Sequence, residues 1–135
     1  MLLSQDRLLE RFLRYVRMHT TSRDDAHSYP SSAGQWELGK LLCSELQSMG
    51  IRDAVQDDHG LVWATVPGTL KGDLPVVAFN AHLDTSPETS GEDVTPQVIR
   101  GYSGGDLRLP GNGERVIDVA ENPELVQMHG HTLVT

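Results

Sequence analysis

Cysteine and long apolar runs are what this 135-residue sequence lacks most clearly. The single cysteine, Cys43, cannot form an internal disulfide, and within a helical pattern it predicts a buried thiol in a reducing compartment. No apolar run approaches the roughly 18 residues of a membrane span, and the first residues lack the charged-then-apolar order of a signal peptide. We therefore expect a cytoplasmic protein with no membrane partner.

Basic and aromatic residues are also few. The 11 Lys and Arg residues are outnumbered by 19 Asp and Glu residues, and the net charge of −8 opposes binding to a phosphate backbone, so nucleic acid is not an expected partner. Trp36 and Trp63 predict core or near-core positions, because no second aromatic is near enough to form a stacking platform. With 38% hydrophobic residues, the chain could bury one modest core, as one domain or as a piece of a larger one.

Two helices are predicted in the first 50 residues. The apolar face of the first is formed by Leu8, Leu9, Phe12, Leu13 and Val16. The second is predicted to begin at Ser32, which would form a capping box with Gln35, and to end at Gly50. Its predicted buried stripe consists of Leu38, Leu41, Leu42, Leu46 and Met49.

Three strands are predicted next. Residues 52–56 and 61–66 would be joined by a tight turn, and the nearly continuous apolar run of residues 74–81 is typical of a strand covered by helices on both faces. Helices followed by strands predict an α/β sandwich. Beyond Asp84 we expect irregular structure, apart from a helical turn at residues 123–128 and a final strand at residues 132–135.

His82 and Asp84 lie at the C-terminal end of that third predicted strand. Side chains two apart in a strand share one face, and a neutral imidazole beside a carboxylate suits a zinc site. Ligands also bind outside the carboxyl ends of strands in open α/β sheets. The alternative is that His82 only forms a loop hydrogen bond while Asp84 caps the turn that follows.

A second pattern, residues 101–105 (GYSGG), matches the G-x-S-x-G elbow of serine hydrolases, with Asp118 and His129 following in the order of that triad. An elbow needs a helix directly after it, whereas the next residues contain a proline and several glycines. Ser103 therefore defines a rival serine-hydrolase hypothesis, against a plain glycine-rich loop.

The remaining histidines predict less. His129 and His131 are spaced as a metal pair could be, but without a third ligand nearby we interpret them as part of an exposed turn. His19, His27 and His59 fall in predicted loops or turns and indicate only surface polarity.

The loop that contains His82 resembles a known family. HLDTSP at residues 82–87, Ser90-Gly91, Val94, Pro96-Gln97 and Tyr102 leading into Gly104-Gly105-Asp106 are similar to the first metal-site strand and following loop of the peptidase T family, the dizinc tripeptide aminopeptidases. The resemblance runs almost end to end. ERFLRYVRMHTTS, YPSSAGQWELGKLLCSELQSMGI and HGLVWATVPG resemble that family's opening helices and hairpin, and ENPELVQMHGHTLVT resembles the segment leading to its second metal-site stretch.

The resemblance implies a role for two residues. His82 would be a ligand of one Zn2+, and Asp84 would be the active-site aspartate that orients and polarises the zinc–histidine unit. In that family two zinc ions share a bridging hydroxide, held by a bridging aspartate and activated by a glutamate base, and the N-terminal residue of a tripeptide is released. The implied fold is a three-layer α/β sandwich with a mixed sheet.

The resemblance also implies that most of the site lies elsewhere. The bridging aspartate belongs to a Gly-Ala-Asp-Asp-Lys-type stretch expected just after Thr135, and the glutamate base, the other zinc ligands and a lid domain would follow it. We therefore expect residues 1–135 to be the incomplete N-terminal part of a zinc-peptidase catalytic domain that does not hydrolyse peptides alone. The alternative is a non-catalytic truncated chain that binds one metal weakly or associates with itself through an uncovered sheet.

Overall fold

The computed structural model of the protein describes residues 4–111 and 115–135, and its chain divides into two units. One unit is Met18–Glu92, and the other combines Met1–Arg17 with Asp93–Thr135. No helix in the described part of the chain has both the length and the apolar content that a membrane crossing requires.

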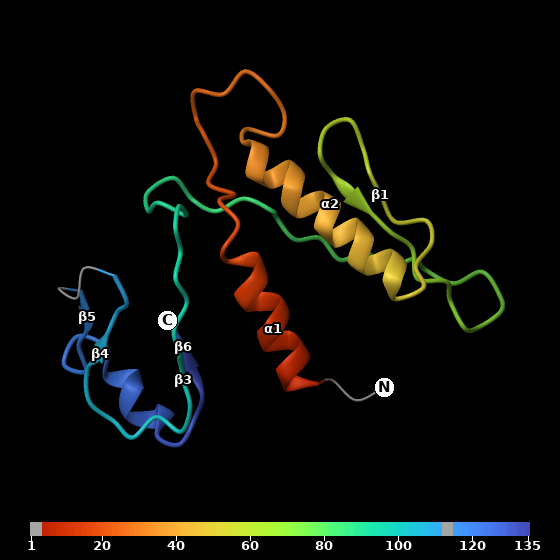
Figure 1. Cartoon of the computed structure of the whole chain (residues 1–135). Helices are drawn as coiled ribbons and strands as arrows, with labels where there is room; N and C mark the ends of the chain where they lie inside the picture. Colours follow the sequence, from red (N-terminus) through yellow and green to blue (C-terminus); the bar gives the residue numbers. More distant parts are fainter. Residues whose placement is uncertain (1–3, 112–114) are drawn as a thin grey trace. The chain divides into compact units, whose positions relative to one another are not determined.

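The unit Met18–Glu92 is organised by the helix α2, Ala33–Ser48, against the hairpin of β1, Val55–Gln56, and β2, Val62–Trp63 (Figure 1). The two strands are antiparallel, with Val55 opposite Trp63, so the predicted hairpin is confirmed. Gly39 is buried where α2 meets the side chain of Gln56. Gly50 follows the helix with φ of 92°, the left-handed conformation expected of a C-terminal glycine.

The predicted second helix is confirmed, but its predicted capping box is wrong. Ser32 occupies the N-cap position without a side-chain capping bond, and the Gln35 side chain is directed to Thr20 and Ser31 instead. Of the predicted buried stripe only Leu38 is buried, whereas Met49 is exposed. Helical periodicity therefore located the helix correctly but overstated how much of it is covered.

The predicted third strand, at residues 74–81, is wrong. Residues 74–81 form no strand, and their apolar side chains face solvent, with Val76 94% and Phe79 95% exposed. A strand needs a neighbour to accept its backbone hydrogen bonds, and among the described residues none pairs with this run. The segment is therefore an uncovered apolar stretch rather than the centre of a sheet.

The second unit contains the helix α1, Gln5–Tyr15, and four short strands. β3, Val98–Ile99, pairs with β6, Leu133–Val134, and β4, Leu107–Arg108, pairs with β5, Val116–Ile117 (Figure 1). The 3-10 helix η1, Pro123–Met128, lies where a helical turn was predicted, and β6 falls within the predicted final strand. The stretch predicted to be irregular therefore carries β3, β4 and β5.

A small core holds this unit together. Tyr102, Leu107 and Leu125 are buried, and partly buried side chains surround them, namely Ile99, Ile117, Val119, Met128 and Leu133. The helix α1 begins at Ser4, whose hydroxyl accepts a hydrogen bond from the Arg7 amide at 3.4 Å. No residue of α1 is buried, and its predicted apolar face is only partly covered, with Leu8 and Phe12 exposed.

The described residues mix helices and strands, as the α/β prediction requires. Their strands form three two-stranded antiparallel sheets, however, and no mixed sheet occurs in the described part of the chain. The strand predicted at residues 74–81 would have been part of such a sheet, and it is not formed.

Candidate functional site

His82 and Asp84 do come together, although not as neighbours on a strand face. The His82 Nδ1 atom lies 2.7 Å from the Asp84 backbone carbonyl oxygen and 3.3 Å from the Asp84 carboxylate Oδ1 atom. Because a carbonyl oxygen can only accept a hydrogen bond, Nδ1 must carry the proton in the neutral ring. The lone pair is then on Nε2, which is the atom free to bind a metal.

The pair is open to solvent. The side chains of His82 and Asp84 are 82% and 43% exposed, respectively. An exposed imidazole on a loop loses conformational freedom when it binds a metal, so its affinity depends on how firmly the loop is held. The residues that hold the loop are therefore part of the site.

Thr85, the residue directly after Asp84, is held by the segment of residues 20–22. Its amide donates to the Thr20 carbonyl at 3.3 Å, and its carbonyl accepts from the Ser22 amide at 2.9 Å and the Ser22 hydroxyl at 3.1 Å. Thr21 and Thr85 form a parallel β-bridge, with their hydroxyl oxygens 3.3 Å apart. The Thr21 hydroxyl also accepts from the Gly91 amide at 3.0 Å, which fastens the loop at a second point.

The first turn of α2 supports that segment in turn. The Gln35 Nε2 atom donates to the Thr20 carbonyl at 3.2 Å and to the Ser31 hydroxyl at 3.1 Å. Thr20 and Gln35 are both buried, at 4% and 6% exposure. Sequence reasoning missed both, because Gln35 three residues after Ser32 was interpreted as half of a capping box.

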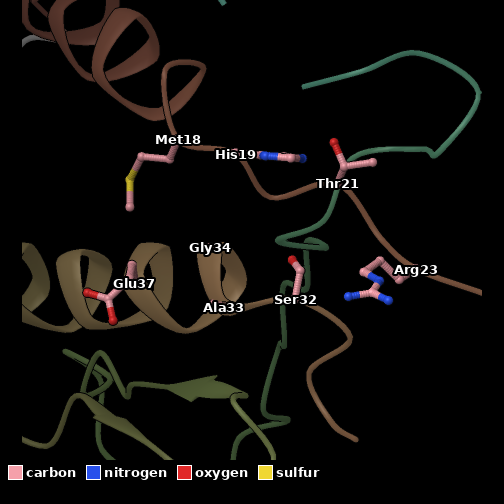
Figure 2. Close-up of a pocket in the computed structure, with 8 residues that line it drawn as sticks. All are labelled: Met18, His19, Thr21, Arg23, Ser32, Ala33, Gly34 and Glu37. Carbon is pink, nitrogen blue, oxygen red and sulfur yellow. The ribbon is translucent and has the colours of Figure 1, made fainter. Parts of the chain in front are cut away.

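A pocket of about 630 Å³ opens beside this support, between residues 18–23 and the start of α2. Figure 2 shows His19 and Thr21 on the segment that passes the first turn of the helix, with Ser32 at its start. The lining residues are Met18, His19, Thr21, Arg23, Ser32, Ala33, Gly34 and Glu37. His19, predicted to be only a surface residue, thus lines a pocket.

The charges at this pocket are already paired. Arg23 makes an ion pair with Asp25 at 3.1 Å, which raises the pKa of the arginine and lowers the pKa of Asp25 through the hydrogen bond and the attraction between the charges. Glu37 similarly binds Lys40 at 2.8 Å. Each of these two ion pairs has no net charge, so they favour neither an anionic nor a cationic ligand in the pocket.

The fit of zinc to these residues is partial. His82 Nε2 suits one metal bond, and Asp84 suits a partner of the imidazole, since its carbonyl and carboxylate oxygens both face Nδ1. Catalytic zinc sites typically have three protein ligands. Within residues 4–111 and 115–135, no group of three or more His, Cys, Asp or Glu side chains could hold a metal ion.

The serine-hydrolase elbow is not formed around Ser103. The chain passes through bends directly into β4, whereas the elbow requires a helix after its serine. Asp118 accepts hydrogen bonds from the Ala120 amide at 2.6 Å and the Glu121 amide at 3.3 Å, as a turn-capping residue does. His129 packs its ring near that of Tyr102, with 6.3 Å between ring centroids.

The other candidates have structural settings. His129 and His131 are exposed near the end of η1, as the predicted turn requires. Cys43 is partly buried in α2, and this burial raises the pKa of its thiol. His59 lies in the hairpin turn, where its amide donates to the Asp57 carboxylate at 2.9 Å.

Comparison with known proteins matches the resemblance noted in the sequence. The chain is 45% identical over 130 residues to a peptidase T of Geobacillus kaustophilus, covering 95% of this chain and 31% of that protein. It is 43% identical to the peptidase T of Salmonella arizonae and of Salmonella dublin, covering 96% of this chain and 32% of each. No protein-family model matches the chain. The chain thus spans about a third of the length of these relatives.

Proposed function

Because the chain is similar to peptidase T over nearly its whole length, we propose that it is the N-terminal part of a zinc-dependent aminopeptidase that removes the N-terminal residue from tripeptides. The observation that carries the proposal is the His82–Asp84 contact within a sequence 45% identical to such a peptidase. Its complete catalytic domain would be a three-layer α/β sandwich with a mixed sheet. Residues 74–81 would then form a strand of that sheet with residues outside this chain.

Each of the two residues would have a distinct task. His82 would bind the metal through Nε2, because its Nδ1 proton is donated to Asp84. Asp84 would fix the orientation of the imidazole and make it a stronger donor to the metal. A bound zinc would supply the activation of water and the stabilisation of negative charge on the scissile carbonyl.

The isolated chain is proposed to be inactive. One imidazole and one carboxylate fall short of the three protein ligands that a catalytic zinc typically keeps, and two zinc ions would require more. The partial coverage of the relatives is consistent with the remaining ligands lying in residues that this chain does not contain.

Calorimetric zinc titration of the chain and of His82→Ala, together with a tripeptide-hydrolysis assay with and without chelator, tests the proposal. We expect weak zinc binding that disappears in His82→Ala, and no hydrolysis by either protein. Joining the chain to the remaining two thirds of a relative should restore chelator-sensitive hydrolysis, and His82→Ala in that protein should abolish it. Unchanged hydrolysis in the joined His82→Ala protein would refute the zinc role.

The second candidate is a non-catalytic chain that associates with a second copy of itself. The exposure of Val76 and Phe79 favours it, because a contiguous apolar strand-forming segment at the surface is a site of association. Under this alternative, hydrolysis never appears and the chain forms dimers or larger species that depend on its concentration.

A further inference from the structure

Gln35 and the His82–Asp84 pair are linked by one continuous series of hydrogen bonds. We propose that Gln35 is a positioning residue, which fixes the His82 imidazole for metal binding through Thr20 and the Asp84–Thr85 peptide group. The metal part of this inference rests on the proposed function. The hydrogen-bonded series itself does not.

The central element is a single peptide plane. The carbonyl of Asp84 and the amide of Thr85 belong to the same rigid, planar unit. The carbonyl accepts the His82 Nδ1 proton at 2.7 Å, and the amide donates to the Thr20 carbonyl at 3.3 Å. Rotating this plane would therefore break both bonds together, so whatever holds the Thr85 amide also holds the acceptor of His82.

The Thr20 carbonyl connects that plane to the helix α2. Its oxygen, which has two lone pairs, accepts both the Thr85 amide and the Gln35 Nε2 group, the latter at 3.2 Å. The second Nε2 proton is donated to the Ser31 hydroxyl at 3.1 Å, so both donors of the amide are used. Donation by the Thr85 amide polarises its own peptide group and so strengthens the Asp84 carbonyl as an acceptor for His82. Gln35 acts differently, by holding the Thr20 carbonyl in place.

The burial of Gln35 supports a specific role. A buried primary amide is costly unless its hydrogen bonds are satisfied, and an apolar side chain would fill the same space without that cost. Gln35 is 6% exposed, whereas His82 at the other end of the series is 82% exposed. A buried side chain on a rigid helix can hold its partners in a fixed position, whereas the metal-binding atom of His82 has to remain accessible.

The experiment compares Gln35→Met with Gln47→Met in the full 135-residue chain. Methionine keeps the length and helix propensity of glutamine but has no donor. Gln47 is the matched control, since it lies in the same helix and its Nε2 donates to the Ala54 carbonyl at 3.0 Å, in the hairpin region. The measurements are nitrogen chemical shifts of the His82 ring, hydrogen exchange of the Thr85 amide and Zn2+ titration of the His82 signal.

We expect Gln35→Met to lower the exchange protection of Thr85, to convert His82 from the Nδ1–H tautomer to a mixture, and to weaken Zn2+ binding about tenfold. Gln47→Met should change none of these. Equal behaviour of the two folded variants would overturn the proposal. If Gln35→Met does not fold, the unchanged chain still tests the series. Scalar coupling should then be measured across the two hydrogen bonds to the Thr20 carbonyl, from the Thr85 amide nitrogen and from Gln35 Nε2 to the carbonyl carbon. Absence of this coupling would overturn the proposal.

Failure of the proposed function gives a different result. In that case Zn2+ would leave the His82 signal of the unchanged chain unmoved, which overturns the metal part. The tautomer of His82 and the exchange of Thr85 would still support or overturn the positioning by Gln35.

Discussion

A Cβ atom placed on Gly34 would lie 1.7 Å from the backbone carbonyl oxygen of His19. The first turn of α2 therefore touches the backbone of the segment that carries Thr20, and only glycine permits this approach. The contact holds residues 19–22 against the helix, and these residues in turn form hydrogen bonds with the amide and the carbonyl of Thr85.

Gly34→Ala should destabilise the unit Met18–Glu92, because the obstacle is backbone that cannot rotate away. Overpacking of this kind costs about 1–3 kcal/mol, and a contact of 1.7 Å with backbone belongs at the upper end, so a net loss of about 1–2 kcal/mol should remain after the ~1 kcal/mol that alanine gains over glycine in a helix. Gly39→Ala is the matched control: its Cβ would meet the flexible end of the Gln56 side chain at 2.0 Å, so the loss should be smaller. Urea unfolding measures both, and an equal loss would contradict the role assigned to the His19 backbone.

The hairpin should lose stability in acid because of Asp57. The Trp63 indole N–H donates to its Oδ2 atom at 3.0 Å, and this bond, with the amides of Leu61 and His59, holds the pKa of Asp57 below its usual range. A carboxyl whose pKa is lowered by folding stabilises the folded state above its ordinary pKa of about 3.9, and that contribution disappears as the pH falls through the lowered value.

Trp63 fluorescence during acid titration measures this effect. Asp57→Asn should weaken the hairpin at neutral pH and remove most of the acid-dependent change. Asp58→Asn removes the same charge one residue away and should keep the transition of the unchanged chain. If both variants titrate alike, the Asp57–Trp63 hydrogen bond is not the cause of the acid-dependent change in stability.

Much of the unit Met18–Glu92 was predictable, and the reason is local. A helix of 16 residues repeats its pattern over several turns, so α2 was located correctly from its own side chains. The hairpin was likewise predicted, because Asp57 to Gly60 form a turn that depends only on adjacent residues. The strands β3, β4 and β5 have two residues each, which is too short for an alternating pattern to be recognised.

The candidate site was only half predictable. The spacing of His82 and Asp84 indicated a pair, but the shorter of the two contacts between them runs to a backbone carbonyl, which no side-chain pattern encodes. Gln35 was assigned to a capping box because local sequence cannot show that Thr20, 15 residues earlier, takes its side chain instead. The prediction of a strand at residues 74–81 was wrong for a related reason, since strand formation depends on a pairing partner and not only on a run of apolar residues.

Tyr102 and Ser103 allow a test of the loop that resembles an elbow. The Tyr102 hydroxyl is bonded to the Gly105 carbonyl and its ring is buried, so Tyr102→Phe should cost about 1 kcal/mol in the free energy of unfolding. Ser103 is exposed, and Ser103→Ala should change stability by less than about 0.5 kcal/mol. Neither variant should alter ester or peptide hydrolysis, and chelator-insensitive hydrolysis lost only in Ser103→Ala would support the serine-hydrolase hypothesis.

Residues 74–81 should make the isolated chain associate as its concentration rises. Phe79 is 95% exposed, and fully burying such a side chain is worth about 1.5–3 kcal/mol, so Phe79→Ser should raise the dissociation constant of a dimer about ten- to a hundredfold. Val66→Ser is the control, because Val66 is 76% exposed but lies outside the segment. Sedimentation equilibrium measures this association. If the chain stays monomeric at high concentration, or if Val66→Ser weakens its association as much as Phe79→Ser does, this segment does not drive association.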